Sequence, residues 1–281
     1  MKFKAIFFDL DETLQMRSPT PPQAFIEFVR SLNFDVSEAV ERRVQRWTHR
    51  YWSQDVQIQQ DRERLSSDEF WINYNMQLWC MSQITDDLEY HAQLSRHWFD
   101  NDYQPDVSVT YGAIETLVAL KEAGFILGLI SNRTMPLTET VNKLGLDGIF
   151  DMILAAGEIG IWKPNPHIFA HALAQFDNLT AADCVYVGDN YYADGCGADA
   201  AGWLPIIFDP NDLYTFSSYK RINHLDELLN LAHDENWHSV SQPHLVQHTS
   251  SRAGSTAAWA SSIGDRYNGS GGGVRRSKFA D

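Results

Sequence analysis

Two aspartates stand at the end of an apolar run near the N-terminus. Residues Ala5 to Phe8 are all apolar, which is typical of a short buried strand, and Asp9 and Asp11 follow it closely. Because alternate residues of an extended chain point to opposite sides, we expect both carboxylates on one side with Leu10 turned away. Carboxylates this close repel each other unless a cation or a shared proton relieves the repulsion. The segment favours metal-assisted carboxylate chemistry, and an ordinary acidic turn after a strand is its alternative.

Other polar groups follow two later apolar runs. The run Ile126 to Ile130 leads into Ser131 and Asn132, and the run Val185 to Val187 leads into Gly188, Asp189 and the more distant Asp194. Between these runs, Lys163 lies in a loop that contains two prolines, just before a predicted helix. In an open α/β sheet, ligands bind outside the carboxyl ends of the strands. We therefore expect all of these groups to meet at that edge.

This set of residues resembles the four motifs of the haloacid dehalogenase-like (HAD) hydrolase superfamily. The DxDxT element runs from Asp9 to Thr13, Ser131 and Lys163 match the second and third motifs, and the GDxxxxD element runs from Gly188 to Asp194. The resemblance spans roughly Met1 to Asp234. It implies an α/β fold, in which a doubly wound parallel sheet forms a Rossmann-like core and an all-helical cap of the subfamily I kind is inserted after the first strand.

The resemblance also implies catalytic roles. Asp9 would be the nucleophile that forms an aspartyl-phosphate, and Asp11 the general acid and then the general base. Lys163 would be the charge that faces both Asp9 and the transferring phosphoryl group. Ser131 and the backbone amides of Asn132 and Arg133 would hold the phosphate oxygens. Thr13, grouped with the substrate-binding residues, would bond locally to shape the turn.

The implied cofactor is Mg2+. Its expected ligands are Asp9, the backbone carbonyl of Asp11, and Asp189, with Asp194 orienting a metal-bound water or pairing with Lys163. Hard divalent cations prefer such oxygen ligands. Asp194 has a second interpretation, as the N-cap of the helix that follows.

The pattern of apolar residues divides the chain into three parts. Strands and helices alternate from Tyr111 onward, so residues 1–14 and 109–235 are predicted to form the core. Residues 15–108 show no strand-like alternation and are predicted to form the helical cap. Its four predicted helices span Ala24–Leu32, Val36–Trp52, Ser66–Met81 and Asp86–Phe99, and Ser66 with Glu69 is a capping-box signature. Residues 236–281 are rich in Ser, Gly, Ala and His and are predicted to be disordered.

Two features of the predicted cap bear on substrate choice. Arg42, Arg46, His49 and Arg50 share one face of a predicted helix. This face is either a basic surface over the active site or an ordinary solvated face. The cap tryptophans are predicted to fill the bundle core, and one or two of them could line a pocket for an aromatic or sugar ring.

Composition narrows the class of protein. The formal net charge is 22 − 37 = −15, which argues against a nucleic-acid partner. Three widely spaced cysteines indicate neither a disulfide framework nor a zinc site. The chain enters its first strand directly, leaving no room for a signal peptide, and no apolar run approaches membrane-spanning length. We expect a cytoplasmic monomer or homodimer that acts on a small phosphorylated metabolite without a membrane partner.

These observations favour a Mg2+-dependent phosphatase that hydrolyses a phosphomonoester. A metal-free 2-haloacid dehalogenase is disfavoured, because family members of that kind resemble this pattern but lack an acid at the position of Asp11. A phosphomutase would keep the same core residues. A non-catalytic binding protein on this scaffold is the remaining alternative, and the intact acids argue against it.

Overall fold

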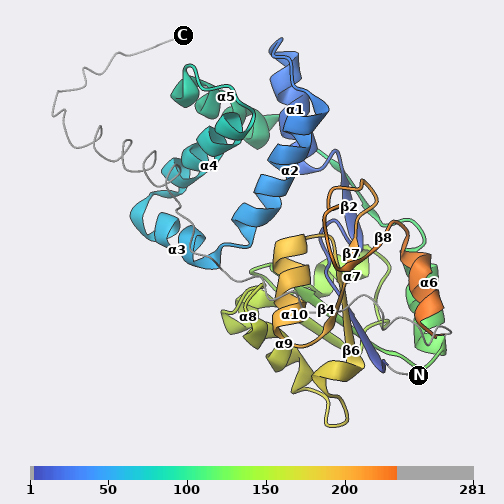
Figure 1. The fold of residues 1–281 in the computed structure, drawn as a ribbon. Coiled ribbons are helices and arrows are strands. Elements are labelled where there is room, and N and C mark those ends of the chain that lie inside the picture. The colour runs from blue at the N-terminus through green and yellow to red at the C-terminus, as the bar shows by residue number, and fades with distance from the viewer. Residues whose placement is uncertain (1–2, 233–281) are drawn as a thin grey trace. The chain divides into compact units, whose positions relative to one another are not determined.

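A six-stranded parallel sheet forms the core of the protein (Figure 1), in a computed structural model that describes residues 3–232. The strand order is β5 (Met152–Ala155), β4 (Ile126–Ser131), β1 (Ala5–Phe8), β6 (Cys184–Gly188), β7 (Leu204–Phe208) and β8 (Lys220–Ile222). The N-terminal strand is central, so Asp9 emerges between the ends of β4 and β6. The predicted α/β fold is confirmed, whereas the predicted tail at 236–281 lies outside the described residues.

Alternating side chains of β1 place a hydrophobic core on each face of the sheet. Ile6 and Phe8 pack in one cluster with residues of α6 (Ala113–Glu122), α7 (Thr138–Lys143) and the 3-10 helix η3 (Leu225–Ala232). Ala5 and Phe7 pack in another with residues of α9 (Pro166–Leu173) and α10 (Gly197–Ala200). The short elements α8 (Ala156–Ile159) and η1 (Ala181–Asp183) complete the alternation. Because both faces are covered, the strands can be apolar throughout.

Five helices form the segment between β1 and the rest of the sheet. They are α1 (Pro21–Ser31), α2 (Glu38–Trp52), α3 (Asp55–Arg64), α4 (Ser67–Met81) and α5 (Leu88–Asn101), and their apolar faces share a separate core around Trp79. Ser66 and Glu69 form the predicted capping box at the start of α4. Within residues 3–232, no helix is both long and apolar enough to cross a membrane.

Two parts of this segment differ from the prediction. Strands β2 (Gln15–Ser18) and β3 (Asp106–Val109) pair as an antiparallel ribbon, so the expected absence of strands from 15–108 is wrong at its two ends. Each strand is only four residues long, and most of β3 is exposed, so neither shows clear alternation. Helix α3 was also missed, because its sequence DVQIQQDRER carries only two large apolar side chains and no apolar stripe.

Candidate active site at the carboxyl ends of the strands

Three carboxylates meet at the carboxyl end of the sheet. Asp9 follows β1, Asp189 follows β6, and Asp194 lies in the π-helical turn η2 (Tyr191–Cys196), with one oxygen of each within 4.8 Å of the others. Burial raises the pKa of Asp9 to about 7, and the carboxylates of Asp194 and Asp11 add to this rise while Lys163 opposes it. Burial, Asp194 and Asp9 likewise raise the pKa of Asp189 well above its usual value. Clustered oxygen donors that resist joint ionisation fit a hard divalent cation, as predicted for Mg2+.

The ammonium group of Lys163 joins two of these carboxylates. Its Nζ donates to Asp9 Oδ1 at 2.7 Å, to Asp194 Oδ1 at 2.7 Å and to the hydroxyl of Tyr186 at 2.8 Å. Only 2% of Lys163 is exposed. Burial alone would lower the pKa of this ammonium, but Asp194 and Asp9 raise it well above its usual value. The side chain is therefore a buried, paired cation at the site, and not a solvated loop lysine.

The same contact gives Asp194 one of its two expected roles, the pairing with Lys163. Its Oδ1 pairs with Lys163, and its Oδ2 accepts the backbone N–H of Asn190 at 2.9 Å. The N-cap of η2 is Asn190, whose side-chain oxygen accepts the N–H groups of Tyr192 and Ala193. Asp194 therefore lies inside the helical turn as the partner of Lys163, and the helix that follows, α10, has Cys196 and not Asp194 at its N-cap.

The end of β4 holds the loop that carries Lys163. The side chain of Asn132 accepts the backbone N–H of Lys163 at 2.8 Å and donates to its carbonyl at 2.9 Å. The hydroxyl of Tyr186 donates to the carbonyl of Ile130 at 2.7 Å. Ser131, the last residue of β4, is buried at the same end of the sheet. The side-chain amide of Asn132 is thus occupied by protein groups.

Thr13 acts across the fold and not within its own turn. Its hydroxyl accepts the backbone N–H of Asp189 at 3.0 Å and lies 3.4 Å from Asp189 Oδ1. Its side chain is fully buried, and its carbonyl accepts the hydroxyl of Thr110. The expectation of a local bond is therefore wrong, because Thr13 fixes the start of the loop after β6.

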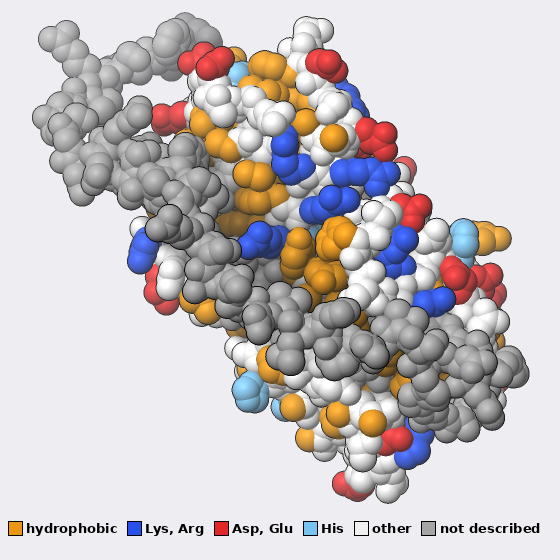
Figure 2. Space-filling model, in the orientation of Figure 1, with side chains coloured by type: hydrophobic (Ala, Val, Ile, Leu, Met, Phe, Trp, Pro, Cys, Tyr) orange, Lys and Arg blue, Asp and Glu red, His pale blue; other side chains and the backbone are white. Residues whose placement is uncertain are grey.

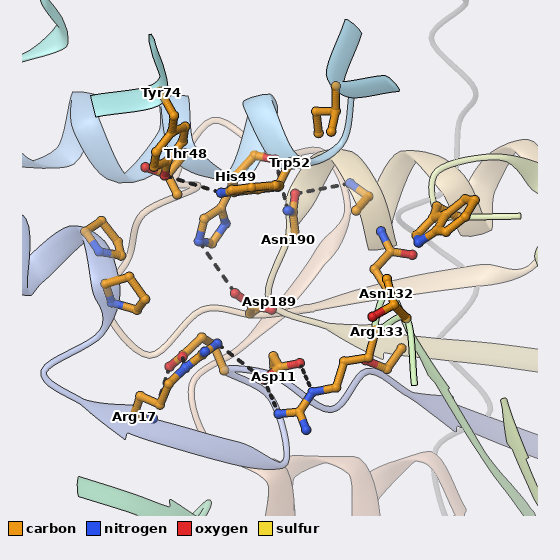
Figure 3. Close-up of a pocket in the computed structure, with 18 of the residues that line it drawn as sticks. Asp11, Arg17, Thr48, His49, Trp52, Tyr74, Asn132, Arg133, Asp189 and Asn190 are labelled. Atoms are coloured by element: carbon orange, nitrogen blue, oxygen red, sulfur yellow. Dashed lines mark hydrogen bonds and ion pairs between the residues drawn. The ribbon is translucent and has the colours of Figure 1, made fainter. Parts of the chain in front are cut away.

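The side chain of Asp11 is directed toward two arginines (Figure 3). Arg133 donates from Nε to Oδ2 at 2.8 Å and from Nη2 to Oδ1 at 2.7 Å, and Arg17 Nη2 lies 3.3 Å from Oδ1. Burial alone would raise the pKa of Asp11, but Arg133 and Arg17 lower it below its usual value. The carboxylate is thus an ionised partner of Arg133, close enough to Asp9 to raise its pKa, although it is not one of the three clustered carboxylates. Asp9 and Asp11 nevertheless border one pocket and Leu10 is buried in the hydrophobic core, as expected from the alternation of side chains.

The predicted basic face of the cap helix α2 contacts the core. Arg42 Nη1 donates to the carbonyl of Asp212 at 2.9 Å, and Arg46 Nε donates to that of Leu213 at 2.8 Å. Neither of the two expectations for this face describes these arginines, because they bind backbone oxygens of the loop after β7. In the space-filling view, Lys and Arg side chains form a band across the visible face, where α1 and α2 run (Figure 2).

His49 of the same helix reaches the carboxylate cluster. Its Nε2 lies 3.6 Å from Asp189 Oδ2, its Nδ1 lies 2.6 Å from the hydroxyl of Tyr214, and its carbonyl accepts the side-chain N–H of Asn190. Burial lowers the pKa of His49 to about 4, although Asp194 and Asp209 oppose the shift. A neutral imidazole therefore lies beside Asp189 at neutral pH.

These groups border a cavity of about 780 Å3. Core residues Asp9, Ser131, Lys163 and Asp189 line one side of it, and residues of α2, α4 and α5 line the other. Trp52 and Trp71 are among them, as expected for one or two of the cap tryptophans. Buried carboxylates and a paired ammonium beside a cavity are the components of a site for polar group transfer.

The sequence matches the family model of haloacid dehalogenase-like hydrolases over residues 3–202. The chain belongs to this family. The match covers β1, the whole helical insertion and the strands that carry Ser131 and Asp189. The resemblance that was drawn from the four motifs is therefore confirmed.

Comparisons with individual proteins agree with this HAD assignment. The chain is 34% identical over 111 residues to a ribulose-1,5-bisphosphate 5-phosphatase of Halopiger xanaduensis, covering 39% of this chain and 46% of that protein. It is 28% identical over 152 residues to a glyceraldehyde 3-phosphate phosphatase of Pyrococcus furiosus, covering 48% and 63%. The magnesium-bound HAD-hydrolase YfnB of Bacillus subtilis superposes with a TM-score of 0.50 at 17% identity, covering 83% of this chain and all of that one. The matched segments thus span about half to two thirds of the two named phosphatases.

Sequence reasoning missed three side chains of this HAD site. Arg133 directly follows Ser131 and Asn132, yet only its backbone amide was considered. Tyr186 lies within an apolar strand, where an aromatic residue is usually part of the core. His49 was identified as part of a basic face, but its spacing gave no sign of Asp189 as its neighbour. The order of residues along the chain could not predict these side-chain contacts, because each joins elements that are far apart in sequence.

Proposed function

We propose that this protein is a Mg2+-dependent phosphomonoesterase that acts on a small phosphorylated metabolite through an aspartyl-phosphate on Asp9. The observation that carries the proposal is the Lys163 ammonium held between Asp9 and Asp194 beside Asp189, at the edge of the cavity. The phosphatases named among the relatives support the same reaction class.

Each core residue has a role in this proposal. A carboxylate oxygen of Asp9 attacks phosphorus as the ester P–O bond breaks, and the phosphoryl group is transferred to Asp9. Lys163 holds the carboxylate in place and faces the charge on the phosphoryl group. Ser131 and the backbone amides of Asn132 and Arg133 hold phosphate oxygens. Since the side-chain amide of Asn132 is engaged with Lys163, its backbone is the part left for substrate.

The metal would be held by Asp9, Asp189 and the backbone carbonyl of Asp11. Asp194 would contribute indirectly, by holding the Lys163 ammonium in position. When bound, Mg2+ supplies positive charge that offsets the repulsion among the carboxylates and the phosphate. Thr13 contributes by fixing the backbone at Asp189.

Asp11 would donate a proton to the leaving alkoxide and then take one from the attacking water. This role needs a protonated Asp11, whereas Arg133 and Arg17 favour the carboxylate. The proposal therefore requires Arg133 to move away from Asp11 when substrate binds. Residues 15–108 would act as the cap over the core of 1–14 and 109–235.

Asp9→Asn tests the assignment, because it removes the nucleophile with little change of shape. We expect phosphate release from a panel that includes glyceraldehyde 3-phosphate and ribulose 1,5-bisphosphate to fall to background. Radiolabelled phosphate should be trapped covalently on the wild-type protein but not on Asp9→Asn. Asp183→Asn, a carboxylate before β6 that pairs with Lys4, is the matched control. Turnover retained by Asp9→Asn, or release of halide from 2-haloacids without Mg2+, would contradict the phosphatase proposal.

A further inference from the structure

The cap side of the cavity carries an aromatic wall, made by Trp52, Trp71, Tyr74, Phe99 and Tyr103. Trp52 is at its centre, with ring centroids 5.9 Å from Trp71 and 5.3 Å from Tyr74. Its indole N–H donates to the hydroxyl of Tyr74 at 3.3 Å. Figure 3 shows Trp52 and Tyr74 on the cap side, opposite Asp11 and Arg133 of the core. Trp52, Trp71 and Tyr74 therefore support one another on the side of the cavity opposite Asp11 and Arg133.

Exposure separates this wall from the cap's own hydrophobic core. Trp79 is fully buried, stacks on His91, and lies outside the set of described residues that line the cavity. Trp52 and Trp71 are only half-buried and border the cavity. Apolar ring surface in contact with water is unfavourable, so a ligand that covers the exposed part of these rings gains that free energy.

The size and polarity of the cavity also point to a ligand with a ring. A volume of about 780 Å3 lies within the range of roughly 300–1,000 Å3 that encloses drug-sized molecules. The polar side chains of Thr48 and Gln59 border the cavity with the aromatic rings. The Arg96 guanidinium carbon lies 5.5 Å from the Trp71 ring centroid. Flat apolar faces beside polar groups match a heteroaromatic ring, which has a π-face and a polar edge.

We propose that the alcohol portion of the substrate carries a planar heteroaromatic ring that stacks on this wall, with Trp52 as its main contact. A nucleoside 5′-monophosphate has this chemistry. The inference rests on the phosphatase function proposed above and narrows its substrate to a class. Stacking of one base on an aromatic side chain corresponds to roughly a 5- to 150-fold change in affinity.

A matched pair of substrates tests the ring without changing the scissile ester. Methyl ribofuranoside 5-phosphate and uridine or adenosine 5′-monophosphate share the same primary alkyl phosphate and differ by the base. We expect kcat/KM for the nucleotides to exceed that for the riboside by roughly 5- to 150-fold, chiefly through KM. Equal kcat/KM values for the pair would overturn the ring proposal and leave the phosphatase intact. If neither compound nor the wider phosphate panel were hydrolysed, the phosphatase function itself would fall.

Variants of Trp52 then test the contact. Trp52→Phe keeps an aromatic face and should retain most of the preference, whereas Trp52→Leu should bring the two substrates within a few-fold of each other. Phe34→Leu is the control, because Phe34 packs on Trp79 in the cap core, with ring centroids 5.8 Å apart, and is not among the described lining residues. It should keep the wild-type preference. A preference that persists in Trp52→Leu would overturn the assignment of Trp52, and the Phe variant separates loss of the ring from loss of folding.

Discussion

The hydroxyl of Tyr186 accepts a hydrogen bond from Nζ of Lys163 at 2.8 Å and donates one to the carbonyl of Ile130. Tyr186 belongs to β6, Ile130 to β4, and Lys163 to the loop before α9, so one hydroxyl joins three parts of the core. All of these atoms are buried. The position of the Lys163 ammonium is thus set by Tyr186 of β6 as well as by the carboxylates.

Tyr186→Phe should lower kcat more than it changes KM. The variant leaves one Lys163 N–H and the Ile130 carbonyl unpaired, which we expect to cost about 1–3 kcal/mol of unfolding free energy. Displacement of Lys163 from Asp9 should lower kcat roughly tenfold or more. Tyr219→Phe is the control, since its hydroxyl bonds Asp199 away from the site. Denaturant unfolding and steady-state kinetics measure both effects, and an unchanged kcat would show that Tyr186 is only structural.

Gly188→Ala should inactivate the protein through Asp194. A Cβ at Gly188 would clash with Asp194 Oδ2, so the carboxylate that holds Lys163 must shift. Gly128→Ala is a matched control, because its Cβ would lie 2.1 Å from Cδ1 of Phe7, in the core beneath the site. Overpacking of this kind costs about 1–3 kcal/mol or more in either variant. We expect both to melt earlier, and activity per folded molecule to collapse in Gly188→Ala alone.

Asp11→Asn should affect substrates according to their leaving groups. If Asp11 protonates the leaving alkoxide, hydrolysis of an alkyl phosphate should slow by roughly 10^2 to 10^4. An aryl or acyl phosphate, whose leaving group needs little protonation, should lose less. Equal losses for both kinds of substrate would instead assign Asp11 to the arginine contacts seen with Arg133 and Arg17.

Asp9 should destabilise the metal-free protein as the pH rises from about 4 to 7, while His49, whose pKa is lowered to about 4, acts in the opposite sense below about pH 6.5. Asp9 has a pKa of about 7 in the fold and the usual 3.8 when unfolded, so the folded state holds the extra proton in this window. We therefore expect Tm in EDTA to be lower at about pH 7.5 than at about pH 5. Mg2+ should raise Tm more at the higher pH, because protons then compete less for the carboxylates.

The control for these Tm measurements in EDTA and Mg2+ is the variant Asp9→Asn. It removes the shifted group, so both the fall of Tm with pH in EDTA and the response to Mg2+ should shrink. A Mg2+ response that is equal at both pH values, or unchanged in the variant, would place the cation elsewhere.

Local features of the chain were enough to predict the core. The apolar runs at Ala5–Phe8, Ile126–Ile130 and Val185–Val187 are the strands β1, β4 and β6, and their ends carry the expected polar groups. A buried parallel strand must be apolar on both faces, so its signal lies in the strand itself. The short ribbon β2–β3 and the polar helix α3 lack such a signal, and they form through contacts with other segments.

For this protein, the sequence by itself determined the family, the parallel sheet and the carboxylates that follow its strands, because motif order and strand patterning are local properties. Only the tertiary structure decided which groups those side chains contact. It paired Asp11 with Arg133, placed Thr13 against Asp189, set Tyr186 against Lys163 and brought His49 of the cap to the core. Each contact joins residues that are distant in the chain. Several charges lie near each buried group, and the packing of the whole fold selects its partner, which residue spacing cannot predict.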